Sequence, residues 1–279
     1  MTLILEKKEL GPGIKSFILL SPMISRKAKP GQFIVLRVSE KGERIPLTLA
    51  DSDPEKGTIR IVCQEVGKTT KQLGELSKGE EILDVVGPLG HASEVKHFGT
   101  VVIVAGGVGI AEAYPIAGAL KMADNRVITI VGARNKDLLI MLDEIKKVSD
   151  EVLTITDDGS SGRKGLVTDQ LRELLEKGTE IDRIIAIGPT IMMKAVADLT
   201  KKYDVPTIVS LNPIMIDATG MCGGCRVSVG GETKFACVDG PEFDARKVDF
   251  EQLLARLGAY KDNERVSYDR CRLENQAHE

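Results

Sequence analysis

The segment HFGTVVIVAGGVGIAEAYPIAGALKMA, residues 97–123, joins an apolar run to a helical pattern through a glycine turn. Residues 101–105 are continuously apolar, which is typical of a buried strand, and the turn GGVG at residues 106–109 ends that strand. A buried strand that enters a helix through a short turn is typical of a parallel α/β sheet. This segment therefore predicts the fold class of the chain around it.

The same alternation continues downstream. Strand patterns and helix patterns take turns, and each helix pattern is amphipathic. The predicted strands are residues 126–134, 151–160, 183–189 and 206–213, and the predicted helices are residues 135–149, 167–178 and 190–203. We therefore expect a parallel sheet with helices on both faces.

The chain before this region has a different texture. Short β-rich runs are separated by Gly, Pro, Lys and Asp, which predicts an antiparallel β domain. These runs are residues 16–22, 31–38, 58–66 and 81–90. Cys63 lies in one of them and is expected to be a small core residue. The charged tail after residue 243 contains one predicted helix, DFEQLLARLG, at residues 249–258.

Composition excludes several classes of protein. A length of 279 residues favours two domains, and a net charge of −3 without a basic run argues against a nucleic-acid partner. No apolar stretch approaches the roughly 20 residues of a membrane helix. The odd count of five cysteines and the absence of a visible signal peptide argue against a disulfide framework. We expect a cytoplasmic protein without a membrane or nucleic-acid partner, whose clustered cysteines bind metal.

Three cysteines and one aspartate form the clearest metal pattern. The stretch DATGMCGGCRVSVGGETKFAC, residues 217–237, reads D-x4-C-x2-C-x11-C, with Asp217, Cys222, Cys225 and Cys237 as candidate ligands. Plant-type [2Fe–2S] proteins use C-x4-C-x2-C…C, so the first ligand here is oxygen instead of sulfur. Zinc held by three thiolates and Asp217 fits the spacing as well, and incidental buried thiols are the third alternative. Cys271 in the polar tail is a distant alternative fourth ligand.

Two glycine turns are candidate phosphate sites. Amides at residues 106–109 sit before a helix, where a pyrophosphate is favoured, although a tight turn that binds nothing has the same sequence. The standard dinucleotide fingerprint needs an acid about 20 residues later, where this chain has Gly132, Ala133 and Arg134. GKTT at residues 67–70 lacks the first glycine of an NTPase loop, because Val62 holds that position. Its amides either hold a phosphate of another ligand or begin a helix that is capped by Thr69 or Thr70.

Further motifs make the chain resemble a known family. R-x-P-L-T at residues 44–48, GKTT at 67–70 and GPLG at 87–90 resemble the flavin domain of ferredoxin–NADP reductase-type flavoproteins. AGGVGIA at 105–111, TDDGS at 156–160 and GPTIMM at 188–193 resemble the nicotinamide domain of the same superfamily. The cysteine loop followed by VDGPEF is similar to one branch. That branch contains the electron-transfer subunit of dihydroorotate dehydrogenase and the small subunit of NADH-dependent ferredoxin:NADP oxidoreductase, also described as a sulfide dehydrogenase subunit.

The resemblance implies an architecture and three cofactors. It implies an N-terminal antiparallel β-barrel that binds FAD over residues 1–96 and an NAD-binding α/β domain over residues 97–211. A [2Fe–2S] loop over residues 212–243 and a C-terminal helix and tail over residues 244–279 would follow. The residues that it implies for FAD and NAD(H) are Arg44, Pro46, Leu47, Thr48, Gly67, Lys68, Thr69, Thr70, Gly87, Gly106, Gly107, Val108, Gly109, Asp157, Asp158 and Gly188.

Within this set, the residues have separate expected roles. Arg44 would neutralise FAD phosphate charge, and Thr48 would lie near the isoalloxazine edge. If Asp157 and Asp158 face the adenine ribose, their charge would disfavour a 2′-phosphate and select NAD over NADP, while Arg134 argues the other way. Without the family context, Arg44 and Thr48 would be read as a solvated strand-end charge and a sheet-surface residue, and the two aspartates as a polar strand end.

Two positions depart from the family pattern. The dihydroorotate branch typically has cysteine where this chain has Asp217, so the branch of the ferredoxin:NADP oxidoreductase resembles it better. Glu112 stands where many relatives have proline, at a helix start that suits a negative charge.

The resemblance also implies partners. Because NADH gives a hydride and a cluster accepts single electrons, a flavin must act between them. We expect a heterodimer with a larger flavin and iron–sulfur subunit, with ferredoxin reached indirectly and electron bifurcation as the function. A dihydroorotate dehydrogenase partner is one alternative, and a zinc-stabilised nucleotide-binding module is another.

Overall fold

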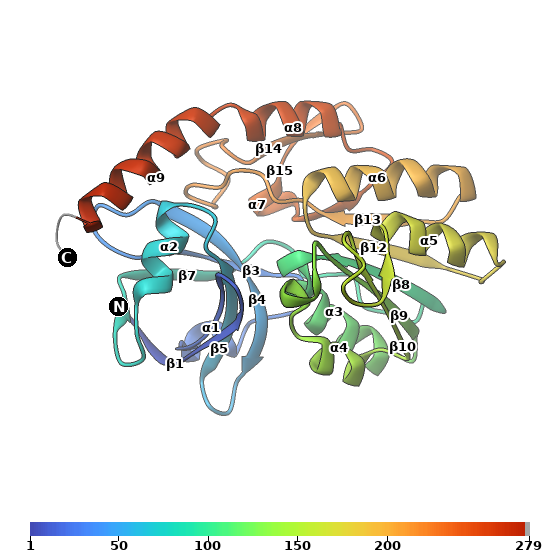
Figure 1. Ribbon diagram of the computed structural model, residues 1–279, viewed down its shortest axis with the longest axis horizontal. Helices are drawn as coiled ribbons and strands as arrows, with labels where there is room; N and C mark the ends of the chain where they lie inside the picture. The colour runs from blue at the N-terminus through green and yellow to red at the C-terminus, as the bar shows by residue number, and fades with distance from the viewer. Residues whose placement is uncertain (277–279) are drawn as a thin grey trace.

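The computed structural model describes the backbone of residues 1–276 and the side chains of residues 1–269. Two seven-stranded sheets lie side by side in it (Figure 1). The first sheet has the order β6-β1-β2-β5-β4-β3-β7 and is antiparallel throughout. Its strands are β1 (Thr2–Gly11), β2 (Ile14–Leu20), β3 (Phe33–Arg37), β4 (Arg44–Asp53), β5 (Thr58–Gln64), β6 (Glu81–Ile82) and β7 (Asp84–Leu89).

This first sheet curls into a nearly closed barrel. β6 pairs with β1 at one edge and β7 pairs with β3 at the other, yet only Leu83 separates β6 from β7 in the chain. The two edges must therefore approach each other. Apolar side chains such as Phe17, Ile34 and Ile61 fill the interior, and Cys63 is buried among them. The predictions of an antiparallel β domain and of a core role for Cys63 are confirmed.

The second sheet has the order β11-β10-β9-β8-β12-β13-β16. All its neighbouring pairs are parallel except β13 and β16, which are antiparallel. The predicted parallel sheet is therefore confirmed, with one antiparallel edge strand added by the segment after the cysteines. Its strands are β8 (Thr100–Gly106), β9 (Arg126–Ala133), β10 (Glu151–Thr156), β11 (Arg163–Lys164), β12 (Arg183–Ile187), β13 (Thr207–Ser210) and β16 (Glu242–Asp244).

Helices cover both faces of this sheet, as the alternating pattern predicts. α3 (Ile110–Met122) and α4 (Leu142–Val148) pack on one face, and α5 (Val167–Glu176) and α6 (Thr190–Thr200) pack on the other. The apolar strands are buried between these two layers because each face contributes its own core. Short 3₁₀ turns η1 (Gly107–Gly109), η2 (Lys136–Leu138) and η3 (Lys201–Tyr203) complete the unit.

The barrel and the α/β unit share a core. Ile14, Ala50 and Val62 of the barrel belong to the same buried apolar cluster as the residues of α3. Arg60 of β5 also pairs with Glu144 of α4 at 2.6 Å. Apolar packing and a polar contact therefore join the two units along one interface.

Some predicted elements differ from those in the structure. The predicted helix at residues 135–149 is two pieces, η2 and α4, because Met141 between them adopts a left-handed conformation with φ of 54°. β1 and β4 were not predicted as strands. Pro46 lies inside β4, and a proline within a run weakens a strand prediction.

The C-terminal part forms an arm across the molecule (Figure 1). After the hairpin β14 (Arg226–Val229) and β15 (Glu232–Phe235) and the short α7 (Ala236–Asp239), the predicted helix appears as α8 (Phe250–Gly258). α9 (Lys261–Gln276) was not predicted. It reaches α2 (Lys68–Glu75) on the barrel, where Lys71 lies 5.7 Å from the ring centre of Tyr268. The remaining helix is α1 (Pro22–Ser25). In the described part of the chain, no helix combines the length and apolar character needed to span a bilayer.

Candidate functional site

Two glycines in the turns after β8 and β12 pack closely against neighbouring backbone. A Cβ on Gly109 would lie 2.5 Å from the carbonyl oxygen of Ile187, and a Cβ on Gly188 would lie 2.9 Å from that of Gly106. Gly107 differs, because its φ is +55° and nothing lies within 4 Å of the place for its Cβ. Because Gly109 and Gly188 have no side chains, the two turns can pack against each other. The backbone at Gly107, in contrast, remains accessible.

A cavity of about 410 Å³ opens over this turn. It lies at the carboxyl ends of the parallel strands, where α/β proteins bind their ligands. Of the predicted cofactor-binding residues, Gly106, Gly107, Val108 and Asp157 line it. The other lining residues come from the barrel, from β9, β10, η2, α5 and α6, and from positions next to these elements. They are Ile14, Gln64, Gly132, Ala133, Arg134, Leu138, Ile155, Leu166, Val167, Thr168, Pro189, Ile191, Met192 and Ala195.

The two adjacent aspartates have different surroundings. Asp157 lines the large cavity together with Arg134. Asp158 is not among the lining residues, and its carboxylate accepts hydrogen bonds from the backbone and hydroxyl of Ser160 at 2.9 and 2.6 Å. These bonds lower the pKa of Asp158 below its ordinary value. Of the pair, Asp157 is thus the one placed to meet a ligand in the cavity.

A second cavity, of about 90 Å³, lies where the barrel meets the α/β unit. We name it the junction cavity. Three predicted flavin residues, Pro46, Leu47 and Thr48, line it, whereas Arg44 is exposed at the start of β4 outside it. The remaining lining residues come from all parts of the chain, and they are Gly31, Phe33, Glu112, Ser210, Leu211, Asn212, Met215 and Pro241.

Glu112 is the buried acid of the junction cavity. It lies in the first turn of α3 and is 8% exposed. Its carboxylate accepts a hydrogen bond from the hydroxyl of Thr48 on β4 at 3.2 Å and another from the hydroxyl of Ser210 on β13. Burial, and to a lesser extent the nearby charge of Glu242, raises the pKa of Glu112 to about 7 against the opposing effect of the two hydroxyls.

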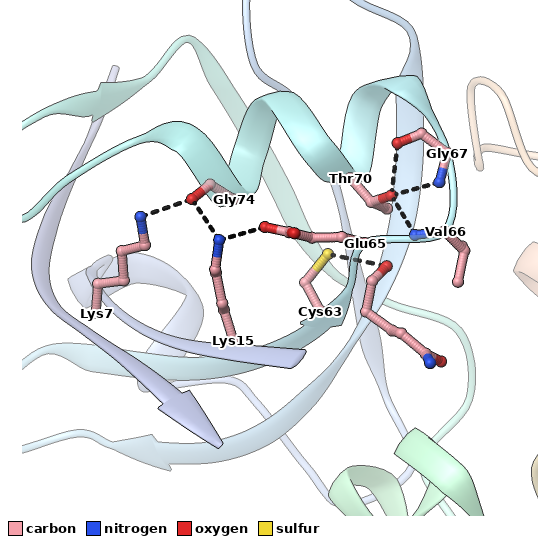
Figure 2. Close-up of polar contacts among 9 residues, drawn as sticks. Lys7, Lys15, Cys63, Glu65, Val66, Gly67, Thr70 and Gly74 are labelled. Atoms are coloured by element: carbon pink, nitrogen blue, oxygen red, sulfur yellow. Dashed lines mark hydrogen bonds and ion pairs between the residues drawn. The ribbon is translucent and has the colours of Figure 1, made fainter. Parts of the chain in front are cut away.

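The segment GKTT begins α2, and Gly67 is its N-cap residue (Figure 2). The hydroxyl of Thr70 accepts hydrogen bonds from the amides of Val66 and Gly67 at 3.1 and 2.9 Å and donates to the carbonyl oxygen of Gly67. A helix start is therefore present, as one alternative predicted, but its N-cap residue is Gly67 and not Thr69 or Thr70. The hydroxyl of Thr70 already occupies the amides of Val66 and Gly67. A phosphate at this helix start would therefore meet the next two amides, those of Lys68 and Thr69.

Two further predicted cofactor-binding residues on the barrel, Thr69 and Gly87, lie away from both cavities and contact other parts of the barrel. Thr69 is buried, and its hydroxyl lies 3.4 Å from a carboxylate oxygen of Glu43. Gly87 packs within the barrel wall, because a Cβ there would lie 2.8 Å from the side chain of Ile34. Neither residue lines the two cavities described above.

The other end of α2 is also held. The ammonium groups of Lys7 and Lys15 donate to the carbonyl oxygen of Gly74 at 2.6 and 3.1 Å, and Lys15 also pairs with Glu65 (Figure 2). Cations at the end of a helix satisfy carbonyl groups that have no helical partner. α2 is thus fixed at both termini to the barrel.

The candidate cluster ligands lie in two pairs. Sγ of Cys222 is 2.9 Å from Oδ1 of Asp217, and Sγ of Cys225 is 3.1 Å from Sγ of Cys237. Within residues 1–269, no three His, Cys, Asp or Glu side chains are grouped as ligands of one metal ion. A binuclear cluster needs two protein ligands at each metal, so two pairs suit it better than a single four-coordinate ion. The side chain of Cys271 lies outside the described residues.

The loop that carries these ligands is shaped by glycine. Gly220 and Gly223 have φ of +84° and +66°, which favours glycine, and the amide of Gly224 lies 3.4 Å from Sγ of Cys222. The thiol of Cys222 holds the pKa of Asp217 at about 2. Burial, helped by Cys225, raises the pKa of Cys237 to about 12. The donor set of one carboxylate and three sulfurs fits a cluster with one oxygen ligand.

This loop packs on the barrel beside the junction cavity. Cys225 and Cys237 share a small buried cluster with Phe33 and Val35 of β3 and with Met215. Phe33 and Met215 also line the junction cavity. Phe33 and Met215 therefore belong both to the buried group that contains the candidate ligands Cys225 and Cys237 and to the lining of the junction cavity.

Sequence reasoning did not assign several lining residues. Ser210 and Asn212 were not singled out, although they lie in the last part of the predicted strand 206–213, at the edge where α/β proteins bind ligands. Glu112 was noted only as a departure at a helix start. Its contacts with β4 and β13 come from distant parts of the chain, so no local pattern predicts them.

Comparisons with known proteins agree with this geometry. Residues 212–249 match the model of the iron-sulfur cluster binding domain of dihydroorotate dehydrogenase B, and residues 103–198 match that of the oxidoreductase NAD-binding domain. A Thermotoga maritima protein, described as a homolog of the dihydroorotate dehydrogenase B (NAD(+)) electron transfer subunit, is 54% identical over 267 residues. These are 96% of this chain and 94% of the relative. A Methanocaldococcus jannaschii protein, described as a probable subunit of that kind, is 35% identical over 91% of both chains.

Solved structures show the same fold. A chain from the NADH-dependent reduced ferredoxin-NADP oxidoreductase, from a study of flavin-based electron bifurcation, has a TM-score of 0.92 and 52% identity, with 97% of each chain covered. The flavohem-like FAD/NAD binding domain of a nitric oxide dioxygenase from Vibrio cholerae has a TM-score of 0.61 at 18% identity. It covers 73% of this chain and 93% of its own, and it supports the fold alone.

Proposed function

This chain belongs to the oxidoreductase family of dihydroorotate dehydrogenase B electron transfer subunits and their homologues, and from that premise we propose that it passes electrons between NAD(H), FAD and a [2Fe–2S] cluster. The observation that carries the proposal is the junction cavity. Its lining comes from the barrel, from the α/β unit and from the segment that carries the cluster ligands. A flavin ring there would lie beside both other cofactors.

Each cofactor has residues of suitable chemistry. The open backbone at Gly107 and the cavity above it suit NAD(H), and the first amides of α2 with Arg44 suit the FAD phosphates. Pro46, Leu47 and Thr48 border the place for the flavin ring. Bound FAD takes a hydride from NADH and releases electrons singly, which is the form that a cluster accepts. Asp217, Cys222, Cys225 and Cys237 would hold that cluster in two pairs.

We divide the chain by function into an FAD part over residues 1–96, an NAD part over residues 97–211, a cluster loop over residues 212–243 and a tail over residues 244–279. The electrons leave to, or arrive from, a larger flavin and iron–sulfur subunit in a heterodimer, with ferredoxin reached indirectly. The 52% identity to a chain of a bifurcating oxidoreductase and the aspartate ligand favour electron bifurcation. A dihydroorotate dehydrogenase partner is the second candidate, supported by the descriptions of the sequence relatives.

The absorption spectrum of the purified protein tests the cofactor set. We expect flavin bands together with broad iron–sulfur absorption, and iron and sulfide in a ratio of two to two. A colourless protein with one zinc ion would instead support a zinc-stabilised nucleotide-binding module. Copurification of the native complex identifies the partner subunit.

The nucleotide preference has a test with a matched control. We expect NADH to reduce the FAD-loaded protein at least tenfold faster than NADPH, because the charge of Asp157 opposes a 2′-phosphate. Asp157→Asn should raise the rate with NADPH, whereas Asp158→Asn should change it little, because Asp158 is held by Ser160 outside the cavity lining. Equal rates for the two nucleotides in the unmodified protein would contradict this assignment.

A further inference from the structure

Glu112 is a buried acid without a cationic partner. Among the side chains of residues 1–269, no Lys, Arg or His forms an ion pair with it, and its hydrogen-bond partners are hydroxyls. The groups that face it are the hydroxyls of Thr48 and Ser210 and, at longer range, the carboxyl of Glu242 on β16. A buried carboxylate is costly without a counter-charge, so this group gains or loses a proton near neutral pH.

Its position links it to the chemistry of the junction cavity. The hydroxyl of Thr48 lines the cavity and donates to Glu112, which lines the same cavity from the opposite unit. A hydroxyl both donates and accepts hydrogen bonds, so it can pass a proton between a ligand and a carboxylate. Glu112 thus stands one hydrogen bond from Thr48, the residue expected at the flavin edge.

The electron balance requires a base at this point. NADH delivers a hydride, which is two electrons and one proton, whereas the cluster takes single electrons and no proton. When both electrons have left for the cluster, the proton that came with them must leave the flavin as well. A carboxylate beside the ring can accept it, and the reverse direction requires the same group to return it.

We propose that Glu112 is the residue that takes this proton from the flavin and returns it in the reverse direction, with the hydroxyl of Thr48 as the link. This inference rests on the proposed function, because it requires the flavin ring to occupy the junction cavity. The residual 8% exposure of Glu112 leaves it in contact with water, to which the proton is then released. Ser210 holds the second carboxylate oxygen and orients the group.

The kinetic test uses Glu112→Gln, which keeps a hydrogen-bond acceptor but cannot carry the proton. Reduction of FAD by NADH should change little, because the hydride brings its own proton. Electron transfer from the reduced flavin to the cluster should slow by about 100-fold, the usual loss when a positioned acid–base group is removed. The rate of that step should also lose its dependence on pH around neutrality, and Glu112→Asp should recover part of it.

Glu242→Gln is the matched control. Glu242 is a half-buried carboxyl on β16 that accepts a hydrogen bond from the hydroxyl of Ser93, and it does not line the junction cavity. This variant should keep fast transfer to the cluster. The midpoint of the pH dependence of this transfer rate should move to lower pH, because the charge of Glu242, which raises the pKa of Glu112, has been removed.

An infrared difference spectrum between the oxidised and reduced protein supplies a readout that does not depend on turnover. The band of a protonated carboxyl group should change on reduction in the unmodified protein and in Glu242→Gln, and should be absent in Glu112→Gln. Persistence of that band in Glu112→Gln, or an unchanged pH profile, overturns the proposal. If Glu112→Gln does not retain FAD, the band must be displaced in Glu112→Asp, and an unmoved band overturns it. An unmodified protein that does not bind FAD rejects the proposed function itself, which is a separate result.

Discussion

The burial of Glu112 has a consequence for stability that does not require any cofactor. The pKa of Glu112 is about 7 in the folded protein, above the usual value of 4.5. Between these pH values the folded protein holds a proton that the unfolded chain has lost. The free energy of unfolding therefore falls as pH rises through this window. Below pH 4.5 Glu112 is protonated in both the folded and the unfolded state, so it has no effect on the pH dependence of stability. Above pH 7 the ionisation of Glu112 lowers the free energy of unfolding by about 3 kcal/mol.

Glu112→Gln should remove this pH-dependent cost. Relative to the unmodified protein, the cofactor-free variant should become more stable as pH rises from 4.5 to 8, by up to about 3 kcal/mol. Denaturant unfolding of both proteins at several pH values measures the difference. A difference that stays constant across this range would show that Glu112 does not titrate there, and Glu176→Gln at the exposed end of α5 is the control.

Asp217 is the proposed cluster ligand whose replacement should change the character of the cluster most. A carboxylate is a harder and less electron-donating ligand than a thiolate, so Asp217→Cys should give an all-thiolate spectrum and a shifted potential. Asp217→Ala should lose the cluster or bind it weakly, because Cys222 would lose its paired ligand. Electron paramagnetic resonance of the reduced variants measures both effects. Cys271→Ala should change little. A native spectrum in Asp217→Ala together with its loss in Cys271→Ala would make Cys271 the fourth ligand.

α2 shows how one short helix depends on contacts with separate strands. Its first turn is closed by Thr70, and its last carbonyl groups are held by Lys7 and Lys15 of the first two strands (Figure 2). With eight residues, α2 is too short to be stable by itself. The barrel therefore fixes the position of the amides of Lys68 and Thr69, where we propose that the FAD phosphates bind.

Two substitutions separate the support of α2 from the binding of phosphate. Thr70→Val removes the capping hydroxyl and should lower stability by about 1 kcal/mol and weaken FAD binding at the same time. Arg44→Ala should weaken FAD binding by a factor of ten or more without a loss of stability, because Arg44 is exposed and only its charge is removed. Thermal unfolding and FAD titration of both variants check this. Full FAD occupancy of Arg44→Ala after gel filtration would refute the role of Arg44.

Sequence patterns predict those helices and strands whose buried and exposed positions follow a regular apolar pattern along the chain. β8, β9, β10, β12 and β13 are largely apolar strands that alternate with helices, and this alternation is visible in the sequence. β4 was missed because Pro46 interrupts its pattern, yet Pro46 still pairs with Val35 of β3. The break at Met141 was missed because a left-handed residue leaves no mark in an apolar run. Local sequence thus predicts the layers but not their interruptions.

The candidate sites also differ in how far the sequence alone predicts them. The ligand spacing from Asp217 to Cys237 and the glycines before α3 lie close together in the chain, so sequence alone indicates them. The junction cavity combines Thr48, Glu112 and Met215 from three distant segments, and only the packing of the barrel against the α/β unit brings them together. Its contents, and the ionisation of Glu112, therefore require the structure.

This arrangement predicts an obligatory order of electron transfer. The large cavity lies over Gly107, the turn there leads into Glu112 at the junction cavity, and Met215 of that cavity packs with Cys225 and Cys237. A hydride cannot pass directly to a one-electron cluster, so the middle position must be filled. Protein with an intact cluster but without FAD should show no reduced-cluster signal in electron paramagnetic resonance when NADH is added anaerobically, and adding FAD should restore it. Dithionite, a direct reductant, should reduce the cluster in both preparations and proves that it is intact. A cluster that NADH reduces without FAD would show that the junction cavity is not on the path.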